Sequence, residues 1–114
     1  MNMNIETKGS IVVAQVEDTQ IGADSADEFK ARILEQLPTE KGQIAVNLAK
    51  VDFMDSSGLG ALVSLLKAVR PEGELVLYGM KASVKEILRL THLDAVFQCE
   101  SNEEGAMATL EKGA

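Results

Sequence analysis

The sequence VDFMDSSGLGAL, residues 51–62, joins an apolar segment to an amphipathic one. Asp55 and Ser56 stand where the two segments meet. Short polar side chains are favoured just before a helix, because their oxygen accepts hydrogen bonds from the unpaired backbone N–H groups of the first turn. We therefore expect a helix to begin here, with Ser56 as its N-cap in a loop open to solvent. A phosphate on Ser56 would lie at the positive end of the helix dipole. The alternative is that Ser56 is a cap and nothing more.

The segments on either side of this loop differ in hydrophobic period. Residues 43–49 have the length and apolar content of a buried strand. After the loop, apolar residues recur at the i, i+3, i+4, i+7 spacing of a helix, at Leu59, Leu62, Val63, Leu66 and Val69. Arg70 and Pro71 should end that helix. The loop thus follows the C-terminal end of a strand and opens a helix.

The rest of the chain alternates between strand and helix signals. We expect a hairpin of residues 5–8 with 11–16, a loop at 18–24, and further strands at 74–79 and 95–99. The spacing S-x-x-E at residues 25–28 and 83–86 predicts capping boxes that open two more helices, and Asn102 should cap a last one. A helical crossover before residues 74–79 implies parallel pairing. The predicted fold is one α/β domain over residues 1–114, with a mixed, mostly parallel sheet of four or five strands covered by about four helices.

The stretch FMDSSGLG, residues 53–60, resembles the phosphorylation-site motif of bacterial anti-sigma factor antagonists, which are single STAS domains. The similarity of length and element order extends from about Ile5 to Leu110. In that family the serine directly after the aspartate is phosphorylated, which corresponds to Ser56, and Ser57 is the second candidate. The resemblance implies a partner-switching regulator. Its unmodified form would bind an anti-sigma factor that is also a serine/threonine kinase, phosphorylation would release it, and a metal-dependent serine phosphatase would restore it.

The helix after Ser56 has an unusual outer face. Small, weakly polar residues stand opposite the apolar stripe, where a solvated helix normally carries charges, at Ser57, Ala61, Ser64 and Ala68. Such residues permit close approach, so we expect a docking surface for a protein partner. We assign to the same surface Asp55, Gly58, Gly60 and, on its flank, Leu65. The alternative is that this face lies under a neighbouring helix of the same domain.

Charge near Ser56 predicts how a phosphate would act. No Lys or Arg occurs between residues 51 and 66, whereas Asp52 and Asp55 are close to Ser56. A phosphate adds roughly −1.5 to −2 charge, and without an arginine in the segment to bind it we expect its effect to be repulsive.

One segment differs from the pattern of the family. Many members have Gly-Glu-Leu/Ile-Asp before the first helix, where this chain has residues 19–22, TQIG, which leaves open which kinase acts and whether Asp24 takes over that position.

Composition excludes several classes of function. The chain has 114 residues, 46% of them hydrophobic, and its net charge of −7 opposes binding to nucleic acid or to an anionic membrane. Residues 1–6 lack the features of a signal peptide, and no apolar run is long enough to span a bilayer. Cys99 is the single cysteine, so no internal disulfide is expected. These features favour a cytoplasmic protein.

Catalytic and cofactor motifs are weak. The pair Gly58 and Gly60 lacks the Lys-Ser/Thr of a P-loop, and we interpret these glycines as permitting close backbone packing at the helix start. The spacing G-x-S-x-G is absent around Ser56 and Ser57, and the lone His92 lies in another element. We expect no enzyme activity, no metal and no cofactor. The main alternative function is a STAS subunit of a membrane transporter complex, such as a lipid-trafficking system, in which the same helix face would be a permanent subunit interface.

Overall fold

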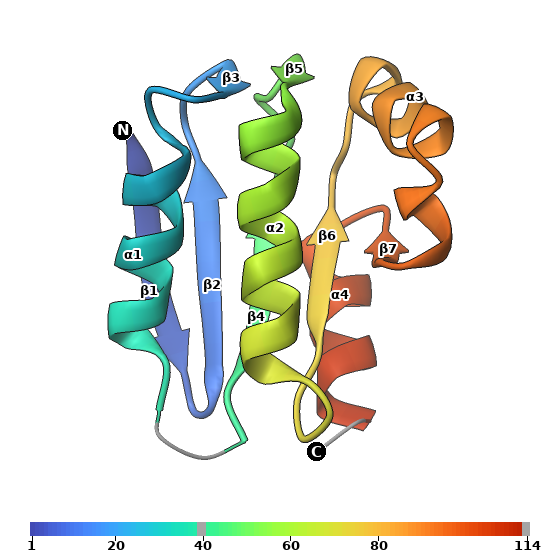
Figure 1. Cartoon of the computed structure of the whole chain (residues 1–114). Helices are drawn as coiled ribbons and strands as arrows, with labels where there is room; N and C mark the ends of the chain where they lie inside the picture. Colours follow the sequence, from blue (N-terminus) through green and yellow to red (C-terminus); the bar gives the residue numbers. More distant parts are fainter. Residues whose placement is uncertain (39–40, 113–114) are drawn as a thin grey trace.

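A central β-sheet organises the chain. The structure, a computed structural model, describes residues 1–38 and 41–112. Five strands form the sheet in the order β1-β2-β4-β6-β7 (Figure 1). Their bounds are Met3–Lys8 for β1, Ile11–Val16 for β2, Gln43–Asn47 for β4, Leu75–Tyr78 for β6 and Gln98–Glu100 for β7. The β1–β2 pair is antiparallel, and the β2–β4, β4–β6 and β6–β7 pairs are parallel.

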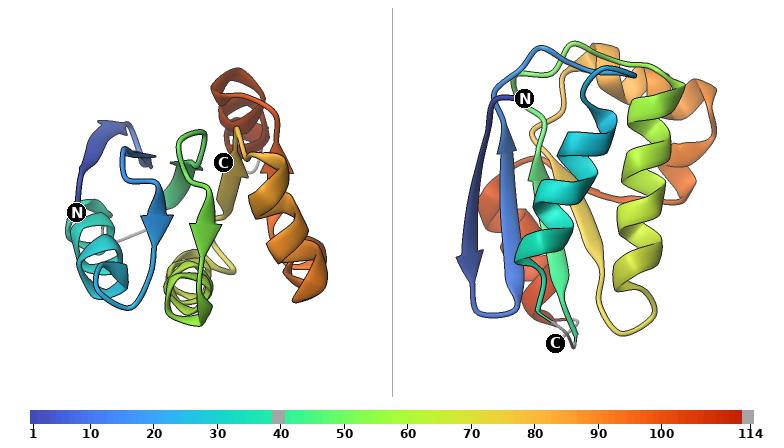
Figure 2. Two further views of the ribbon diagram at one scale, coloured as in Figure 1. Left: turned by 90° about the horizontal axis from the view of Figure 1, so that it is seen from above. Right: turned by 60° about the vertical axis from the view of Figure 1, so that its left-hand side comes forward.

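Helices cover both faces of this sheet. Figure 2 shows α1, α2 and α3 on one face and α4 on the other. The helices span Ala26–Gln36 for α1, Ser56–Val69 for α2, Ala82–Leu90 for α3 and Glu103–Lys112 for α4, with a short 3₁₀ helix at Leu93–Ala95. Parallel strands joined by helical crossovers need cover on both faces, which explains the near-continuous apolar content of β4 and β6.

Alternation along the strands divides the core in two. In β2, Val12 and Ala14 face the larger core beneath α1 and α2, while Ile11 and Val13 face the smaller core beneath α4. The smaller core is closed by Ala106 and Leu110 of α4, both fully buried. Because successive strand residues point to opposite faces, one strand sequence supplies both cores.

The fold predicted from the sequence is confirmed, although several strand bounds differ; β1, for example, begins at Met3 and not at the predicted Ile5. The segment 18–24, predicted as a loop, contains the short strand β3 (Gln20–Ile21), which pairs in parallel with β5 (Phe53–Met54). The edge strand predicted at residues 95–99 instead occupies Gln98–Glu100, because a 3₁₀ turn takes up Leu93–Ala95. The β3–β5 pair is two residues long, and so short a pairing leaves little periodic signal in a sequence.

Both predicted capping boxes are wrong in their hydrogen bonds, although the helices start close to the expected positions. The Ser25 hydroxyl accepts from the Gly22 backbone N–H at 3.3 Å instead of capping α1. In α3 the residue before the helix is Lys81, and Ser83 lies inside the first turn. Serine side chains bond readily to nearby backbone groups, so local turns compete with capping. Asn102 does cap α4, since its Oδ1 accepts from Gly105 N–H at 2.8 Å.

Candidate functional site

The start of α2 is capped by Asp55 and not, as predicted, by Ser56. Asp55 has extended backbone geometry, and its Oδ1 accepts from the Gly58 N–H at 3.0 Å. Ser56 is therefore the first residue of the helix, and it is exposed. The aspartate cap leaves the Ser56 hydroxyl outside the capping interaction. A modification of that hydroxyl would not remove the cap.

The same Asp55 carboxylate contacts a second segment. Its Oδ2 accepts from the Ala23 N–H at 3.1 Å, in the loop between β3 and α1. The hydrogen bond from Gly58 N–H, with further ones from Ala23 and Ser57, holds the pKa of Asp55 below its ordinary value of 3.8, although desolvation acts in the opposite direction. Asp55 is thus a charged acceptor at neutral pH.

The two glycines in the first turns of α2 have different roles. A side-chain carbon at Gly58 would lie 2.2 Å from the Ile21 carbonyl oxygen, so Gly58 permits the close packing of α2 on β3 that the sequence led us to expect. A side-chain carbon at Gly60 would meet nothing within 4 Å. The packing explanation is therefore wrong for Gly60, which is exposed inside a helix, where glycine costs roughly 0.5–1 kcal/mol relative to alanine.

The predicted docking surface is partly exposed and partly covered. Ser57, Gly60, Ser64 and Ala68 are exposed on α2. Asp55 is partly exposed, and the remaining three predicted members lie inward: Gly58 is buried, Ala61 is 7% exposed and Leu65 is 0% exposed. The assignment of Leu65 to the surface is wrong, because its position on the helix faces the core. We call the exposed set Ser57, Gly60, Ser64 and Ala68 the α2 face.

A groove runs between α1 and α2, which lie side by side over the sheet (Figure 1). Its volume is about 350 Å³. The α2 wall is formed by Ser57, Gly60, Ala61 and Ser64, and the opposite wall by Ala23, Ala26, Asp27 and Lys30. The alternative prediction, that this face lies under a neighbouring helix, therefore holds only for the edge at Ala61. Much of the α2 face remains open.

A cation that the sequence did not place here lies close to the loop. Lys81, at the start of α3, pairs with Asp52 at 2.6 Å between Nζ and Oδ1, across 29 residues of sequence. Lys81 shortly follows β6, and the C-terminal ends of neighbouring parallel strands meet at one edge of a sheet, which is the signal that could have located it. The negative charge of Asp52 is thus partly compensated. The loop is less acidic than its own sequence indicates.

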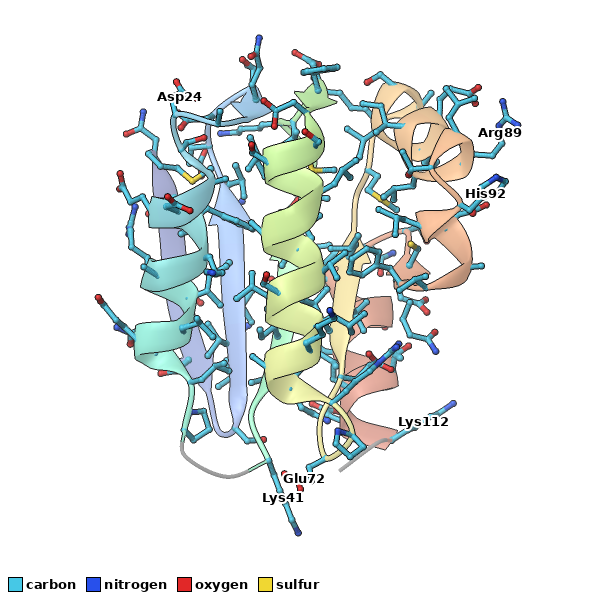
Figure 3. All side chains as sticks on the ribbon, viewed as in Figure 1. Asp24, Lys41, Glu72, Arg89, His92 and Lys112 are labelled. Atoms are coloured by element: carbon cyan, nitrogen blue, oxygen red, sulfur yellow. The ribbon has the colours of Figure 1, made fainter. Side chains whose placement is uncertain are left out.

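Two further features lie at the same end of the molecule. Phe53, on β5, is 50% exposed, although no surface role was predicted for it. Residues 19–22, where the acidic pair of the family is missing, are held against β5, since Thr19 O accepts from Asp52 N–H at 2.7 Å. Asp24 lies in the next loop, before α1 (Figure 3), and is exposed. Asp24 is the first acidic residue after residues 19–22, the segment that differs from the family.

The other candidate chemistry is not gathered at this site. His92 lies just beyond the end of α3, and Figure 3 shows it on the other side of the molecule from Asp24. Within residues 1–38 and 41–112, no three His, Cys, Asp or Glu side chains are close enough together to hold a metal ion. In the same described residues, no helix combines the length and apolar character needed to cross a membrane.

Comparison with known proteins places this geometry in a family. The STAS domain family matches residues 2–106. The anti-sigma-B factor antagonist of Listeria monocytogenes is 32% identical over 94% of this chain and 96% of its own, and that of Staphylococcus aureus (strain NCTC 8325) is 31% identical over 91% and 98%.

Solved structures share the fold at lower sequence identity. An anti-sigma-factor antagonist (STAS) domain protein from Planctomyces limnophilus has a TM-score of 0.85 at 18% identity, covering 96% of this chain and 97% of that one. The Bacillus cell fate determinant SpoIIAA in its phosphorylated form has a TM-score of 0.68 at 18% identity, covering 95% and 98%. With these matches over nearly its whole length, and with an aspartate-capped helix carrying two serines in its first turn, the chain belongs to the STAS-domain family of anti-sigma factor antagonists.

Proposed function

We propose that this protein is a partner-switching regulator controlled by phosphorylation of Ser56. In its unmodified form it binds an anti-sigma factor that is also a serine/threonine kinase. Phosphorylation of Ser56 releases the partner, and a serine phosphatase restores binding. The observation that carries the proposal is the position of Ser56, exposed in the first turn of α2 and adjacent to the exposed α2 face. Its similarity to the anti-sigma-B factor antagonists of Listeria and Staphylococcus, and to SpoIIAA, which has a phosphorylated form, supports the proposal.

The cap geometry makes Ser56 a suitable acceptor of phosphate. Because Asp55 supplies the capping oxygen, the Ser56 hydroxyl can be modified without unmaking the bond to Gly58 N–H. The helix N-terminus tolerates the added negative charge. Ser57 is also exposed but lines the groove, whose other wall includes Asp27. The same wall carries Lys30, so its charges do not discriminate between the two serines. The choice of Ser56 rests on its exposure at the start of α2 and on the resemblance of residues 53–60 to the phosphorylation-site motif of the family.

The phosphate would act at the rim of the α2 face. It brings roughly −1.5 to −2 charge and three acceptor oxygens next to the Asp55 carboxylate. The nearby cation Lys81 is already paired with Asp52. A partner that packs closely against the α2 face would then have to bury uncompensated negative charge. Release of the partner therefore needs no change of fold.

The decisive experiment compares Ser56→Ala with Ser57→Ala. Each variant is incubated with the kinase anti-sigma factor and ATP, and the modified residue is located by phosphopeptide mapping. We expect Ser56→Ala to stay unmodified and to bind the partner whether or not ATP is present, while Ser57→Ala is modified like wild type. Full modification of Ser56→Ala with none of Ser57→Ala would assign the switch to Ser57. A wild-type chain that is never modified would contradict the proposal and favour a permanent subunit.

A further inference from the structure

The Asp55 carboxylate joins two backbone segments that are distant in sequence. Oδ1 accepts from Gly58 N–H at 3.0 Å, and Oδ2 accepts from Ala23 N–H, 32 residues away, at 3.1 Å. A helix cap requires only one acceptor oxygen. The second oxygen is therefore available to fix the loop between β3 and α1 against the start of α2. We call this pair of hydrogen bonds the Asp55 clamp.

The clamped loop forms part of the proposed site. Ala23 lies on one wall of the groove and Ser57 on the other. The loop turns tightly just before α1, with Ala26 N–H donating to Gly22 O at 2.8 Å. It also approaches the carboxylate closely, since a side-chain carbon at Gly22 would lie 3.0 Å from Asp55 Oδ2. The position of this wall relative to α2 thus depends on Asp55.

We infer that Asp55 is a positioning residue for the phosphorylation of Ser56, because its clamp holds the loop before α1 and the first turn of α2 in one fixed arrangement for the kinase. The inference rests on the proposed function. It assigns to the Ala23 hydrogen bond a role that is separate from helix capping. A kinase must align the acceptor hydroxyl with its bound nucleotide, and misplacement of a reacting group by about 1 Å can cost up to about a hundredfold in rate.

Four substitutions at Asp55 separate capping, charge and clamping. Asp55→Ser retains one short acceptor oxygen for Gly58 N–H but cannot reach Ala23 at the same time. Asp55→Asn keeps the size and has a single acceptor oxygen. Asp55→Glu keeps the charge and both oxygens but carries them one carbon farther from the backbone. Asp55→Ala removes cap and clamp together.

Asn102→Ala is the matched control. It deletes the cap of α4, whose Oδ1 bond to Gly105 N–H is 2.8 Å long, on the opposite face of the sheet from α2. The loss of a single cap costs a similar stability in either helix, typically about 1 kcal/mol. A variant that slows phosphorylation only by loosening the fold would therefore behave like Asn102→Ala.

Two measurements are made on the full chain: kcat/KM for phosphorylation by the kinase anti-sigma factor, and hydrogen exchange of the Ala23 amide. We expect Asp55→Ser, Asp55→Asn and Asp55→Glu each to accelerate Ala23 exchange and to lower kcat/KM at least about tenfold. Asp55→Ala should be at least as slow. Asn102→Ala should match wild type in both measurements.

Three results would overturn the inference. One is a wild-type rate for Asp55→Ser although its Ala23 amide exchanges fast, and another is an equal slowing in Asn102→Ala. The third is unchanged Ala23 exchange in all four Asp55 variants, which would show that the clamp does not hold the loop. A wild-type chain that the kinase never modifies is a different result, because it contradicts the proposed function itself.

Discussion

Gly58 packs directly against the backbone of Ile21: a side-chain carbon at Gly58 would lie 2.2 Å from the Ile21 carbonyl oxygen. That separation is far shorter than van der Waals contact, and the neighbouring atom is backbone, so it cannot rotate away. Ile21 belongs to β3 and Gly58 to the first turn of α2. The close approach fixes the strand that precedes α1 against the helix that carries Ser56.

The first prediction concerns Gly58→Ala. Alanine favours helix, yet here the added carbon would force β3 and α2 apart, so we expect the free energy of unfolding to fall by about 1–3 kcal/mol. Urea unfolding followed by circular dichroism would measure the change. Unfolding at the wild-type urea concentration would show that the two backbones separate without cost.

Gly60→Ala should have the opposite effect on stability. A side-chain carbon there meets nothing within 4 Å, so alanine should raise the free energy of unfolding by roughly 0.5–1 kcal/mol. If the partner packs on the α2 face, the same methyl group should weaken binding. Urea unfolding and calorimetric titration with the anti-sigma factor would measure both effects. A variant that is more stable and binds like wild type would place Gly60 outside the interface.

Charging the far end of the α2 face should separate binding from packing. Ala68 is exposed, so Ala68→Glu should leave the melting temperature nearly unchanged and weaken partner binding. Ala108→Glu is the control, since Ala108 is exposed on α4, on the opposite face of the sheet. Equal affinity for the two variants would contradict docking on α2. Ala61→Glu is unsuitable because Ala61 is only 7% exposed, and it should also destabilise the fold.

The phosphate mimic Ser56→Asp tests whether release is electrostatic. It places a third carboxylate beside Asp52 and Asp55, and we expect a partial loss of affinity, because aspartate has less charge and bulk than a phosphate. Raising salt from about 0.15 M to 1 M shortens the Debye length from roughly 8 Å to 3 Å, so the affinity ratio of wild type to mimic should shrink. Titrations at both salt concentrations would measure this ratio. A ratio independent of salt would point to steric exclusion.

The lowered pKa of Asp55 predicts how its contribution to stability depends on pH. Because the native pKa lies below the ordinary value of 3.8, the charged form stabilises the fold above that value, and this contribution is lost as pH falls through the native pKa. The stability difference between wild type and Asp55→Asn should thus be constant near neutral pH and shrink in acid. Urea unfolding across this range would measure it. A difference that persists at the lowest pH at which both chains fold would contradict the hydrogen-bonded carboxylate.

Much of the fold could be predicted from local pattern. The β-branched content of residues 11–16, the apolar runs at β4 and β6, and the helical stripe of α2 are all properties of residues close in sequence, so the elements could be predicted locally. The motif at residues 53–60 likewise indicated the family. The position of Ser56 at the start of a helix was also determined by its own neighbours.

Tertiary structure decided which side chains take part at that helix start. The Asp55 cap itself is a local contact with Gly58, but the second oxygen of Asp55 accepts from Ala23, 32 residues earlier, and Lys81, just after β6, pairs with Asp52. Leu65 of α2 faces the larger core. Gly58 is packed against the Ile21 backbone, whereas Gly60 has open space around it, and only the three-dimensional structure shows this difference. Each of these contacts joins segments that lie far apart in the chain or depends on how α2 packs on its neighbours. Local pattern determined the elements, and the packing of parallel strands and their helices determined which groups meet at their ends.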